Sequence, residues 1–329
     1  MPRAWNLIAR PTGLPGPECF SLVETPPAPL ADGEVRVRNT WLSVDPYMRG
    51  RMNDVKSYVP PFGLNEAMTG GAVGVVVESR ADDLKPGDRV MHMLGWRDEA
   101  VGKPPEFMPL PDLGVPDQMF LGLLGITGLT AYFGLFDVAE AKAGDTVFVS
   151  AAAGAVGSAV VQFAKLKGMT VIGSAGGAEK CALVRDLGAD AVIDYKADRP
   201  LVKQLAEAAP DGIDVYFDNV GGEHLDAALA VARNHGRFAM CGMIESYNTG
   251  APLSLQYAIR IVGFRLQLRG FIISDYMHRM SEFFAEVGPW AAAGKLKNIE
   301  TIRDGLEGAP DAFRELFSGG NKGKMVVRL

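Results

Sequence analysis

The sequence predicts an α/β protein with two domains, a small β-rich domain and a second domain built on a doubly wound parallel sheet. The first prediction depends on residues 1–118, where short β-branched and aromatic runs are separated by clusters of Pro and Gly. The second depends on residues 145–294, where short apolar strands alternate with helical patterns. A chain of 329 residues is long enough for both domains.

In the first domain we expect five strands: Ala4–Ala9, Phe20–Glu24, Glu34–Leu42, Gly71–Glu78 and Arg89–Leu94. The stretch Asp117–Asp137 is apolar on nearly every face and shows no strand alternation, so it predicts buried helices between the domains. The tail ends in a further strand, Lys324–Arg328, which suits the first domain better than the second. We therefore expect residues 1–122 and 295–329 to form the β-rich domain and residues 123–294 to form the other.

Residues 145–177 have the pattern of one strand–helix–strand unit. A β-branched run, Thr146–Ser150, leads into the small-residue loop Ala151–Gly157, an apolar-periodic helix and a second strand, Thr170–Ser174. This order predicts the Rossmann unit that binds a dinucleotide, with Ala152 where the first glycine would stand. Glycines in such a loop let the backbone approach a pyrophosphate and let the helix close onto the strand. The predicted cofactor-binding residues of this loop are Gly154, Ala155, Val156 and Gly157. The alternative is a tight turn that binds no ligand.

Later strands of the second domain are expected at Ala191–Asp194, Val215–Asn219, Arg237–Met240 and Arg265–Ile273. Ligands of a doubly wound sheet bind at the carboxyl ends of its strands. Residues at or just after the ends of the last three strands are therefore predicted to contact the cofactor: Asn219, Cys241, Gly242, Phe271 and Ile272. For Cys241, a small buried hydrophobe is the alternative.

The corner after the second strand indicates which dinucleotide is bound. The strand end, Ser174–Gly177, carries no acid, whereas an NAD-specific site places Asp or Glu about 20 residues past the glycines. A corner of small residues at Gly176, with the ammonium group of Lys180 nearby, suits the 2′-phosphate of NADP(H). Glu179 does not fit this pattern, because its charge would repel a phosphate. We explain its presence by the helix dipole, which favours an acid in the first turn of a helix. For Lys180, an ordinary exposed helix lysine is the alternative.

The composition argues against several classes of function. The formal net charge of −6 disfavours nucleic acid or an anionic membrane as the main partner. No apolar run approaches the length of a membrane span, and Met1–Arg10 lacks the core of a signal peptide. Three widely spaced cysteines, Cys19, Cys181 and Cys241, predict neither a disulfide framework nor a zinc cluster. We therefore expect a cytoplasmic protein.

Six short segments stand out in chain order: VDPYMRG (44–50), GLTAYFGL (128–135), AAAGAVGS (151–158), YFDNVGG (216–222), CGMIESYN (241–248) and GGNKGK (319–324). Together they resemble the medium-chain dehydrogenase/reductase superfamily. Within it they resemble the zinc-free prostaglandin reductases and alkenal double-bond reductases, the leukotriene hydroxydehydrogenase-like subfamily. The resemblance covers essentially the whole chain and implies a GroES-like β domain for substrate, followed by a Rossmann domain for the dinucleotide.

The same resemblance raises the question of zinc. Zinc alcohol dehydrogenases of this superfamily use an early Cys and a later Gly-His-Glu segment, but here these regions are Leu42–Pro46 and Met68–Gly71, without Cys, His or Glu. The four-cysteine structural lobe is also absent, and His92 is the only histidine in the first 220 residues. We therefore expect no metal. Such a site suits NADPH-dependent reduction of a carbon–carbon double bond conjugated to a carbonyl better than alcohol oxidation.

The resemblance also implies roles for individual residues. Tyr247 is the candidate catalytic donor to the carbonyl or enolate oxygen and contacts both substrate and cofactor, while Tyr47 resembles a substrate-pocket residue. Contacts with the cofactor are implied for Thr130 and Asn321 at its nicotinamide end and for Tyr195 beside the adenine-ribose phosphate. Each role has a structural alternative. Tyr247 and Tyr47 could be packed tyrosines, and Thr130 could be an ordinary threonine inside a helix. Asn321 could be an asparagine that suits a glycine-rich turn.

The leading hypothesis is an NADPH-dependent 2-alkenal/2-enone reductase acting on a small unsaturated carbonyl compound. A quinone oxidoreductase of the same superfamily and a non-catalytic NADP-binding protein are the alternatives. In this superfamily the region equivalent to Arg265–Ile273 often joins two subunits, so we expect a homodimer paired along this strand. The remaining histidines are expected at the surface: His224, His235 and His278.

Overall fold

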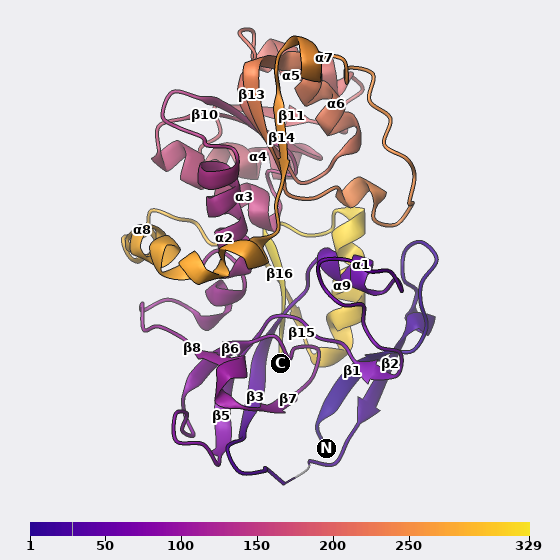
Figure 1. Ribbon diagram of the computed structural model, residues 1–329, viewed down its shortest axis with the longest axis vertical. Helices are drawn as coiled ribbons and strands as arrows, with labels where there is room; N and C mark the ends of the chain where they lie inside the picture. The colour runs from indigo at the N-terminus through magenta and orange to yellow at the C-terminus, as the bar shows by residue number, and fades with distance from the viewer. Residues whose placement is uncertain (28) are drawn as a thin grey trace. The chain divides into compact units, whose positions relative to one another are not determined.

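The computed structural model describes residues 1–27 and 29–329, and it divides into two compact units (Figure 1). The first unit comprises Met1–Leu121, Glu300–Asn321 and Met325–Leu329. The second comprises Gly122–Ile299 and Lys322–Lys324. Most of the C-terminal segment therefore belongs with the N-terminal third of the chain, while the short turn Lys322–Lys324 groups with the middle of the chain.

An antiparallel sheet forms the centre of the first unit, in the order β15-β16-β3-β5-β6-β8, with β7 also paired to β3. Its strands are β3 (Val35–Ser43), β5 (Ala72–Ser79), β6 (Arg89–His92), β7 (Glu99–Gly102), β8 (Phe107–Pro109), β15 (Glu300–Asp304) and β16 (Lys324–Arg328). A smaller sheet contains β2 (Phe20–Glu24), β1 (Arg3–Leu7) and β4 (Glu66–Ala67). Because β16 pairs antiparallel with β3, the end of the chain completes a sheet that its beginning starts (Figure 1).

Apolar residues explain why β3 lies inside this sheet. Val35 and Val37 are fully buried and share one apolar core with Val76, Val90 and Phe107. Full burial of each such side chain contributes about 1.5–3 kcal/mol relative to exposure. By contrast, the sequence analysis missed β4, β7 and β8, because runs of two, four and three residues are too short to show an alternation.

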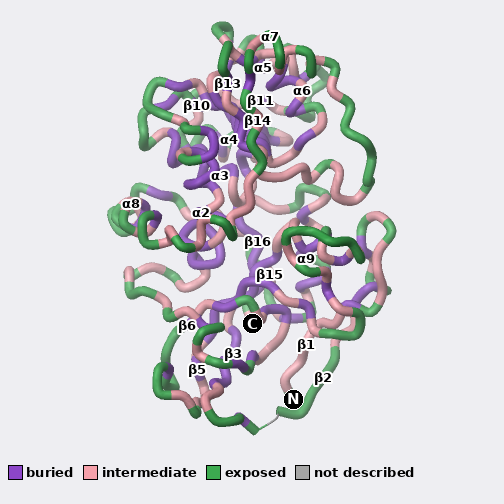
Figure 2. The backbone as a smooth tube through the Cα atoms, in the orientation of Figure 1, coloured by how far each residue is buried: buried purple, intermediate pink, exposed green. Residues whose placement is uncertain are grey.

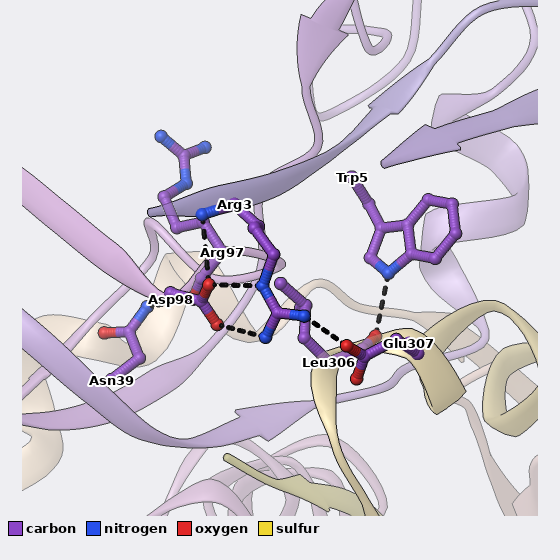
Figure 3. A network of polar contacts seen from close by, with 7 residues as sticks. All are labelled: Arg3, Trp5, Asn39, Arg97, Asp98, Leu306 and Glu307. Carbon is purple, nitrogen blue, oxygen red and sulfur yellow. Dashed lines mark hydrogen bonds and ion pairs between the residues drawn. The ribbon is translucent and has the colours of Figure 1, made fainter. Parts of the chain in front are cut away.

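A network of polar contacts joins β1 to the C-terminal segment within the first unit (Figure 3). The Arg3 guanidinium donates to both carboxylate oxygens of Asp98, with an Nε–Oδ2 distance of 2.8 Å, and also to the carboxylate of Glu307. Beside it, Trp5 Nε1 donates to the carbonyl oxygen of Leu306 at 2.7 Å. The charge of Arg3 is thus matched by two carboxylates from distant parts of the chain.

A six-stranded parallel sheet, in the order β11-β10-β9-β12-β13-β14, forms the centre of the second unit. Its strands are β9 (Thr146–Val149), β10 (Thr170–Ala175), β11 (Ala191–Asp194), β12 (Ile213–Asp218), β13 (Ala232–Met240) and β14 (Gln267–Gly270). The helices between successive strands are α3 (Ala155–Leu166), α4 (Ala178–Asp186), α5 (Leu201–Ala208) and α6 (Gly222–Val231). The strand order reverses between β9 and β12, which confirms the predicted doubly wound sheet.

The last strand is shorter than the sequence suggested. Only Gln267–Gly270 pair with β13, instead of the predicted Arg265–Ile273. Arg265 has a φ of +52°, which an extended strand excludes, and a 3₁₀ helix begins at Ile273. The apolar run therefore overestimated the strand, because Phe271 packs its ring against Phe217 after the strand has ended.

The predicted buried helices of Asp117–Asp137 are confirmed. They are a 3₁₀ helix at Asp117–Leu121, α2 (Ile126–Phe133) and a π-helical turn at Gly134–Val138, and most of their residues are buried. Burial is also concentrated in the central strands β9, β10 and β12 of the parallel sheet, while α7 (Arg260–Gly263) and most of α8 (Met280–Ala292) remain more accessible (Figure 2). Within residues 1–27 and 29–329, no helix combines the length and the apolarity that crossing a bilayer requires.

Candidate active site

In the second unit, glycine-rich and polar segments follow the carboxyl ends of the parallel strands. β9 leads into residues 150–157, β10 into 176–177, β11 into 195–196, β12 into 219–221 and β13 into 241–243. Because the strands of this sheet are parallel, their carboxyl ends meet along one edge, and sheets of this kind bind ligands where the strand order reverses, here between β9 and β12. Most of the residues predicted to contact a dinucleotide are therefore brought to one edge of the second unit.

Close backbone contacts shape the loop after β9. A Cβ atom on Gly157 would lie 2.3 Å from the carbonyl oxygen of Ala151, so only glycine lets α3 begin this close to the loop. Gly154 precedes α3 in an extended conformation. The first-turn amides of Ala155 and Val156 have no acceptor within the helix, and such amides form an anion-binding site together with the helix dipole. The loop therefore fits a pyrophosphate group.

Tyr195 and Lys196 close the corner after β10. A Cβ atom on Gly176 would lie 2.7 Å from the Tyr195 hydroxyl oxygen and 2.9 Å from Lys196 Cε, so both side chains occupy the space that glycine leaves. Asp194 Oδ1 accepts hydrogen bonds from the amides of Gly177 and Lys196, both at 2.9 Å, and these bonds lower the pKa of Asp194. The carboxylate at the end of β11 thus ties two loops together.

Three lysines gather at this corner. Burial lowers the pKa of Lys180, and the neighbouring charges of Lys196 and Lys322 lower it further, while Glu179 opposes them. Like charges that share a site repel one another, so a bound anion would stabilise the cluster. The sequence analysis named Lys180 and missed the other two. Lys196 follows directly on a strand end and could have been found by that rule, whereas no local pattern connects Lys322 with this corner.

Asn219 joins the two strands at the reversal of strand order. Its amide donates to Ser150 Oγ and its Nδ2 donates to the carbonyl oxygen of Ser150, both at 2.8 Å. Beside it, Asp218 Oδ1 accepts the Tyr216 hydroxyl at 2.7 Å and the amides of Val220 and Gly221. Burial nevertheless raises the pKa of Asp218. The contacts with Ser150 hold Asn219 in place between the ends of β9 and β12. Its predicted contact with the cofactor stays a prediction.

The segment after β13 places a tyrosine hydroxyl against the backbone. The amides of Cys241 and Gly242 donate to the carbonyl oxygen of Asp218 at 2.9 and 3.0 Å. A Cβ atom on Gly242 would lie only 3.0 Å from the Tyr247 hydroxyl oxygen. The predicted donor, Tyr247, therefore lies at the same strand end as Cys241 and Gly242. Burial raises the pKa of the Cys241 thiol to about 12, so this thiol stays protonated at neutral pH.

Three further predicted residues of the second unit have contacts or positions with a structural explanation. Thr130 Oγ1 donates to the carbonyl oxygen of Ile126 at 2.7 Å, inside α2. Phe271 packs edge-on against Phe217 and Tyr276, and Ile272 lies beyond the end of β14. Such contacts suffice to explain Thr130 and Phe271 as parts of the fold, and the cofactor contacts of all three residues stay predictions.

Tyr47 and Asn321 belong to the first unit. Tyr47 begins α1 (Tyr47–Arg51), and its buried hydroxyl oxygen makes no hydrogen bond of ordinary geometry among the described residues, although the charge of Arg51 acts on it. Burial raises the pKa of this hydroxyl. An unsatisfied buried polar group costs about 1–3 kcal/mol, which a bound polar ligand would recover. Asn321 follows α9 (Ala309–Ser318) and directly precedes Lys322.

The buried histidines have structural roles, and His224 corrects the expectation that it lies at the surface. Its ring stacks on Phe148 and meets Tyr195 edge-on, and burial lowers its pKa to about 4. The helical pattern around it did not show that this face of α6 packs on the sheet. His92 is also buried, with Nε2 at 2.9 Å from Asn39 Oδ1. In the described part of the chain, no three His, Cys, Asp or Glu residues are grouped as metal ligands.

Two family models match the chain. Residues 3–110 match the model described as the N-terminal domain of oxidoreductase, and residues 155–288 match the model described as zinc-binding dehydrogenase. The chain is 44% identical over 335 residues to the NADPH-dependent curcumin reductase of Escherichia coli (strain K12). The alignment covers 99% of this chain and 96% of that protein. It is 42% identical over 302 residues to the 2-alkenal reductase (NADP(+)-dependent) of Nicotiana tabacum, covering 91% and 88%.

Solved structures give the same result. The crystal structure of CurA in complex with NADPH from Vibrio vulnificus superposes with a TM-score of 0.93 at 43% identity, covering 99% of this chain and 98% of that one. The two-unit architecture and the similarity over the whole length define a medium-chain dehydrogenase/reductase. Within that superfamily, the chain belongs to the zinc-free reductase family that includes the curcumin, 2-alkenal and prostaglandin reductases, as its motifs predicted.

Proposed function

We propose that this protein is an NADPH-dependent reductase that saturates the carbon–carbon double bond of α,β-unsaturated aldehydes and ketones. The names of its relatives support the proposal, since they describe an NADPH-dependent curcumin reductase and a 2-alkenal reductase. The residues present also fit the dinucleotide. A glycine loop stands at the start of α3, and three lysines gather at a corner without a side chain on Gly176.

Three places along the strand ends would hold the cofactor. The amides after Gly154 would bind the pyrophosphate, and Lys180 with Tyr195 would bind the 2′-phosphate. Backbone groups of Gly242, fixed by the hydrogen bonds to Asp218, would meet the nicotinamide end. When bound, NADPH supplies a hydride for the β-carbon of the substrate.

Tyr247 is the proposed catalytic residue. Its hydroxyl lies against Gly242 and would donate a hydrogen bond to the carbonyl oxygen of the substrate. Negative charge develops on that oxygen during reduction, so the donor stabilises the transition state more than the ground state. The enolate would then take a proton at its α-carbon from solvent or from a hydroxyl group, which restores the carbonyl. Tyr47, with its unsatisfied buried hydroxyl, is the proposed second contact with the substrate.

The single observation that carries this mechanism is the position of the Tyr247 hydroxyl beside Gly242, just after the end of β13. The direct test is NADPH oxidation with a small 2-alkenal, with a quinone and with no substrate, combined with analysis of the product. We expect rapid oxidation with the alkenal and a product that keeps its aldehyde and carries deuterium from labelled NADPH at the β-carbon. Turnover of the quinone alone would instead indicate a quinone oxidoreductase, and no turnover would indicate a non-catalytic NADP-binding protein.

We further propose a homodimer that pairs along β14. This strand ends the parallel sheet, and among the described residues β13 is its one neighbour, so its outer edge is available for pairing. A monomer found by light scattering at micromolar concentration would contradict this assembly. The free thiols of Cys19, Cys181 and Cys241 suit a reducing compartment, and we propose the cytoplasm, which cell fractionation would test.

A further inference from the structure

The turn Lys322–Lys324 is fixed to the second unit by its backbone. The amide of Gly323 donates to the carbonyl oxygen of Ala153 at 2.7 Å, and the amide of Lys324 donates to that of Ile299 at 2.8 Å. Gly323 has a φ of +60°, and a Cβ atom there would lie 1.9 Å from the Ile299 carbonyl oxygen. Only glycine therefore fits, and the backbone of Lys322 is held beside the loop that precedes α3.

From this position Lys322 reaches the first turn of α4. Its Nζ lies 2.5 Å from Glu179 Oε1, and this hydrogen bond is the main reason why the pKa of Glu179 is lowered. Both side chains are exposed, with 42% and 80% of their surface accessible. An ion pair this exposed contributes little to folding stability. Its effect on the electrostatics of its surroundings is therefore of more interest than its effect on the fold.

The surroundings of this ion pair are the proposed 2′-phosphate corner. Glu179 is the neighbour of Lys180 in the sequence. The charges of Lys196 and Lys322 lower the pKa of Lys180, and the charge of Glu179 raises it. A carboxylate at this place would repel a phosphate dianion. The other acid nearby, Asp194, accepts the backbone amides of Gly177 and Lys196. The corner thus keeps an excess of positive charge because a lysine from the C-terminal turn offsets Glu179.

We propose that Lys322 is a specificity-determining residue for NADPH: by binding the Glu179 carboxylate it removes the repulsion that this acid would exert on the 2′-phosphate. The inference rests on the proposed use of NADPH and adds to it a residue distant in sequence from the nucleotide-binding motif. Lys322 acts on the cofactor indirectly, because it neutralises the Glu179 carboxylate. It is therefore not a catalytic residue. NADH, which lacks the 2′-phosphate, should be almost insensitive to it.

Three variants test this mechanism by fluorescence titration with NADPH and with NADH. Lys322→Met should weaken NADPH binding by about 3- to 10-fold at low salt and change NADH binding by less than about 2-fold, as expected for exposed charges. Glu179→Gln should leave NADPH binding unchanged or tighten it. The double variant Lys322→Met/Glu179→Gln should return NADPH binding to within about 2-fold of the wild type, because the acid that needed a partner is gone.

The chain offers a matched control at the other end of the same helix. Lys297 Nζ pairs with Asp186 Oδ2 at 2.6 Å, and this pair is also exposed. Lys297→Met should therefore leave the preference for NADPH unchanged. Equal melting temperatures of the two lysine variants would show that the cofactor effect of Lys322→Met does not come from loss of folding.

Two results would overturn the inference. One is a Lys322→Met protein that keeps its full preference for NADPH. The other is a double variant that binds NADPH as weakly as Lys322→Met alone, since that would assign Lys322 a direct contact with the phosphate. Failure of the proposed function is distinguishable from both, because a wild-type protein that binds NADPH and NADH equally would have no preference to lose.

Discussion

Charged residues are arranged in opposite ways in two clusters, one in each unit. In the first unit, Arg3 is matched by the carboxylates of Asp98 and Glu307 (Figure 3). At the corner of the second unit, Lys180 is surrounded by Lys196 and Lys322, with Glu179 as the opposing charge. The first arrangement is complete within the described residues, because each charge has its partner. In the second arrangement the charges of Lys196 and Lys322 both act against the charge of Lys180, which favours binding of an anion.

This difference separates structural charges from functional ones. A matched ion pair at the surface adds a modest amount to stability and requires no ligand. A cluster of like charges lowers the stability of the unliganded protein, and it persists where binding of an opposite charge is the purpose. Substitutions in the two clusters should consequently change different measurements: stability at the Arg3 ion pairs, and cofactor binding at the lysine corner.

The largest effect is expected at the proposed catalytic residue. Tyr247→Phe keeps the aromatic ring and removes the hydroxyl, so kcat should fall by roughly 10- to 1,000-fold, while NADPH affinity stays nearly unchanged. Steady-state kinetics with several enones and a cofactor titration would measure both. A folded Phe variant with wild-type turnover would remove Tyr247 from the mechanism.

Gly242→Ala provides a second way to reach the same hydroxyl. Its Cβ atom would lie 3.0 Å from the Tyr247 oxygen, so the hydroxyl has to shift. We expect kcat to fall in the same direction as in Tyr247→Phe but by a smaller factor. A combined variant should be no slower than Tyr247→Phe alone, because the two changes act on one group.

Lys180→Ala should give the next largest effect. Loss of a charge-assisted contact with a phosphate costs about 1–3 kcal/mol, which corresponds to roughly 5- to 150-fold weaker NADPH binding. NADH binding should change little, so the preference between the two cofactors should largely disappear. An equal loss of affinity for both cofactors would instead assign Lys180 a structural role.

Tyr47→Phe should separate stability from function in the first unit. Its buried hydroxyl makes no hydrogen bond of ordinary geometry among the described residues, so removing it should leave stability unchanged or raise it by about 1 kcal/mol. The KM for the enone should rise at the same time, if this hydroxyl binds substrate. A destabilised variant with unchanged kinetics would contradict the proposed role, and thermal unfolding together with steady-state kinetics measures both quantities.

Arg3→Gln should produce the smallest change. The ion pair with Asp98 is partly exposed, so its loss should cost about 0.5–1 kcal/mol of unfolding free energy. Neither kcat nor the preference for NADPH should change. A measurable loss of cofactor preference in this variant would break the distinction between the two regions, and chemical denaturation with kinetics on the same preparation would detect it.

The sequence predicted those parts of the molecule that depend on local patterns. The βαβ unit, the glycine loop and the order of helices and strands in the second unit follow from periodicity and turn residues close together in the chain. The short strands β4, β7 and β8 were missed, because pairing with distant partners decides them. The early end of β14 was missed because an apolar run does not distinguish strand pairing from ring packing at Phe271.

The candidate site shows the same division. Gly157, Gly176 and Lys180 could be proposed from the sequence because they lie in or just after one strand–helix–strand motif. The contact between Lys322 and Glu179 joins residues that only the folded chain brings together, and no pattern in either segment indicates it. The burial of His224 depends likewise on the packing of α6 against the sheet, and its ring contact with Phe148 was not visible in the sequence.

The central claim is that the lysine corner of the second unit is a binding site for a 2′-phosphate. The most direct test compares binding of adenosine 2′,5′-bisphosphate and adenosine 5′-monophosphate to the wild-type protein by calorimetry, at low and at high salt. The bisphosphate should bind at least about 10-fold more tightly at low salt, and the advantage should shrink as salt screens the exposed charges. Equal affinities for the two nucleotides at low salt would contradict the claim.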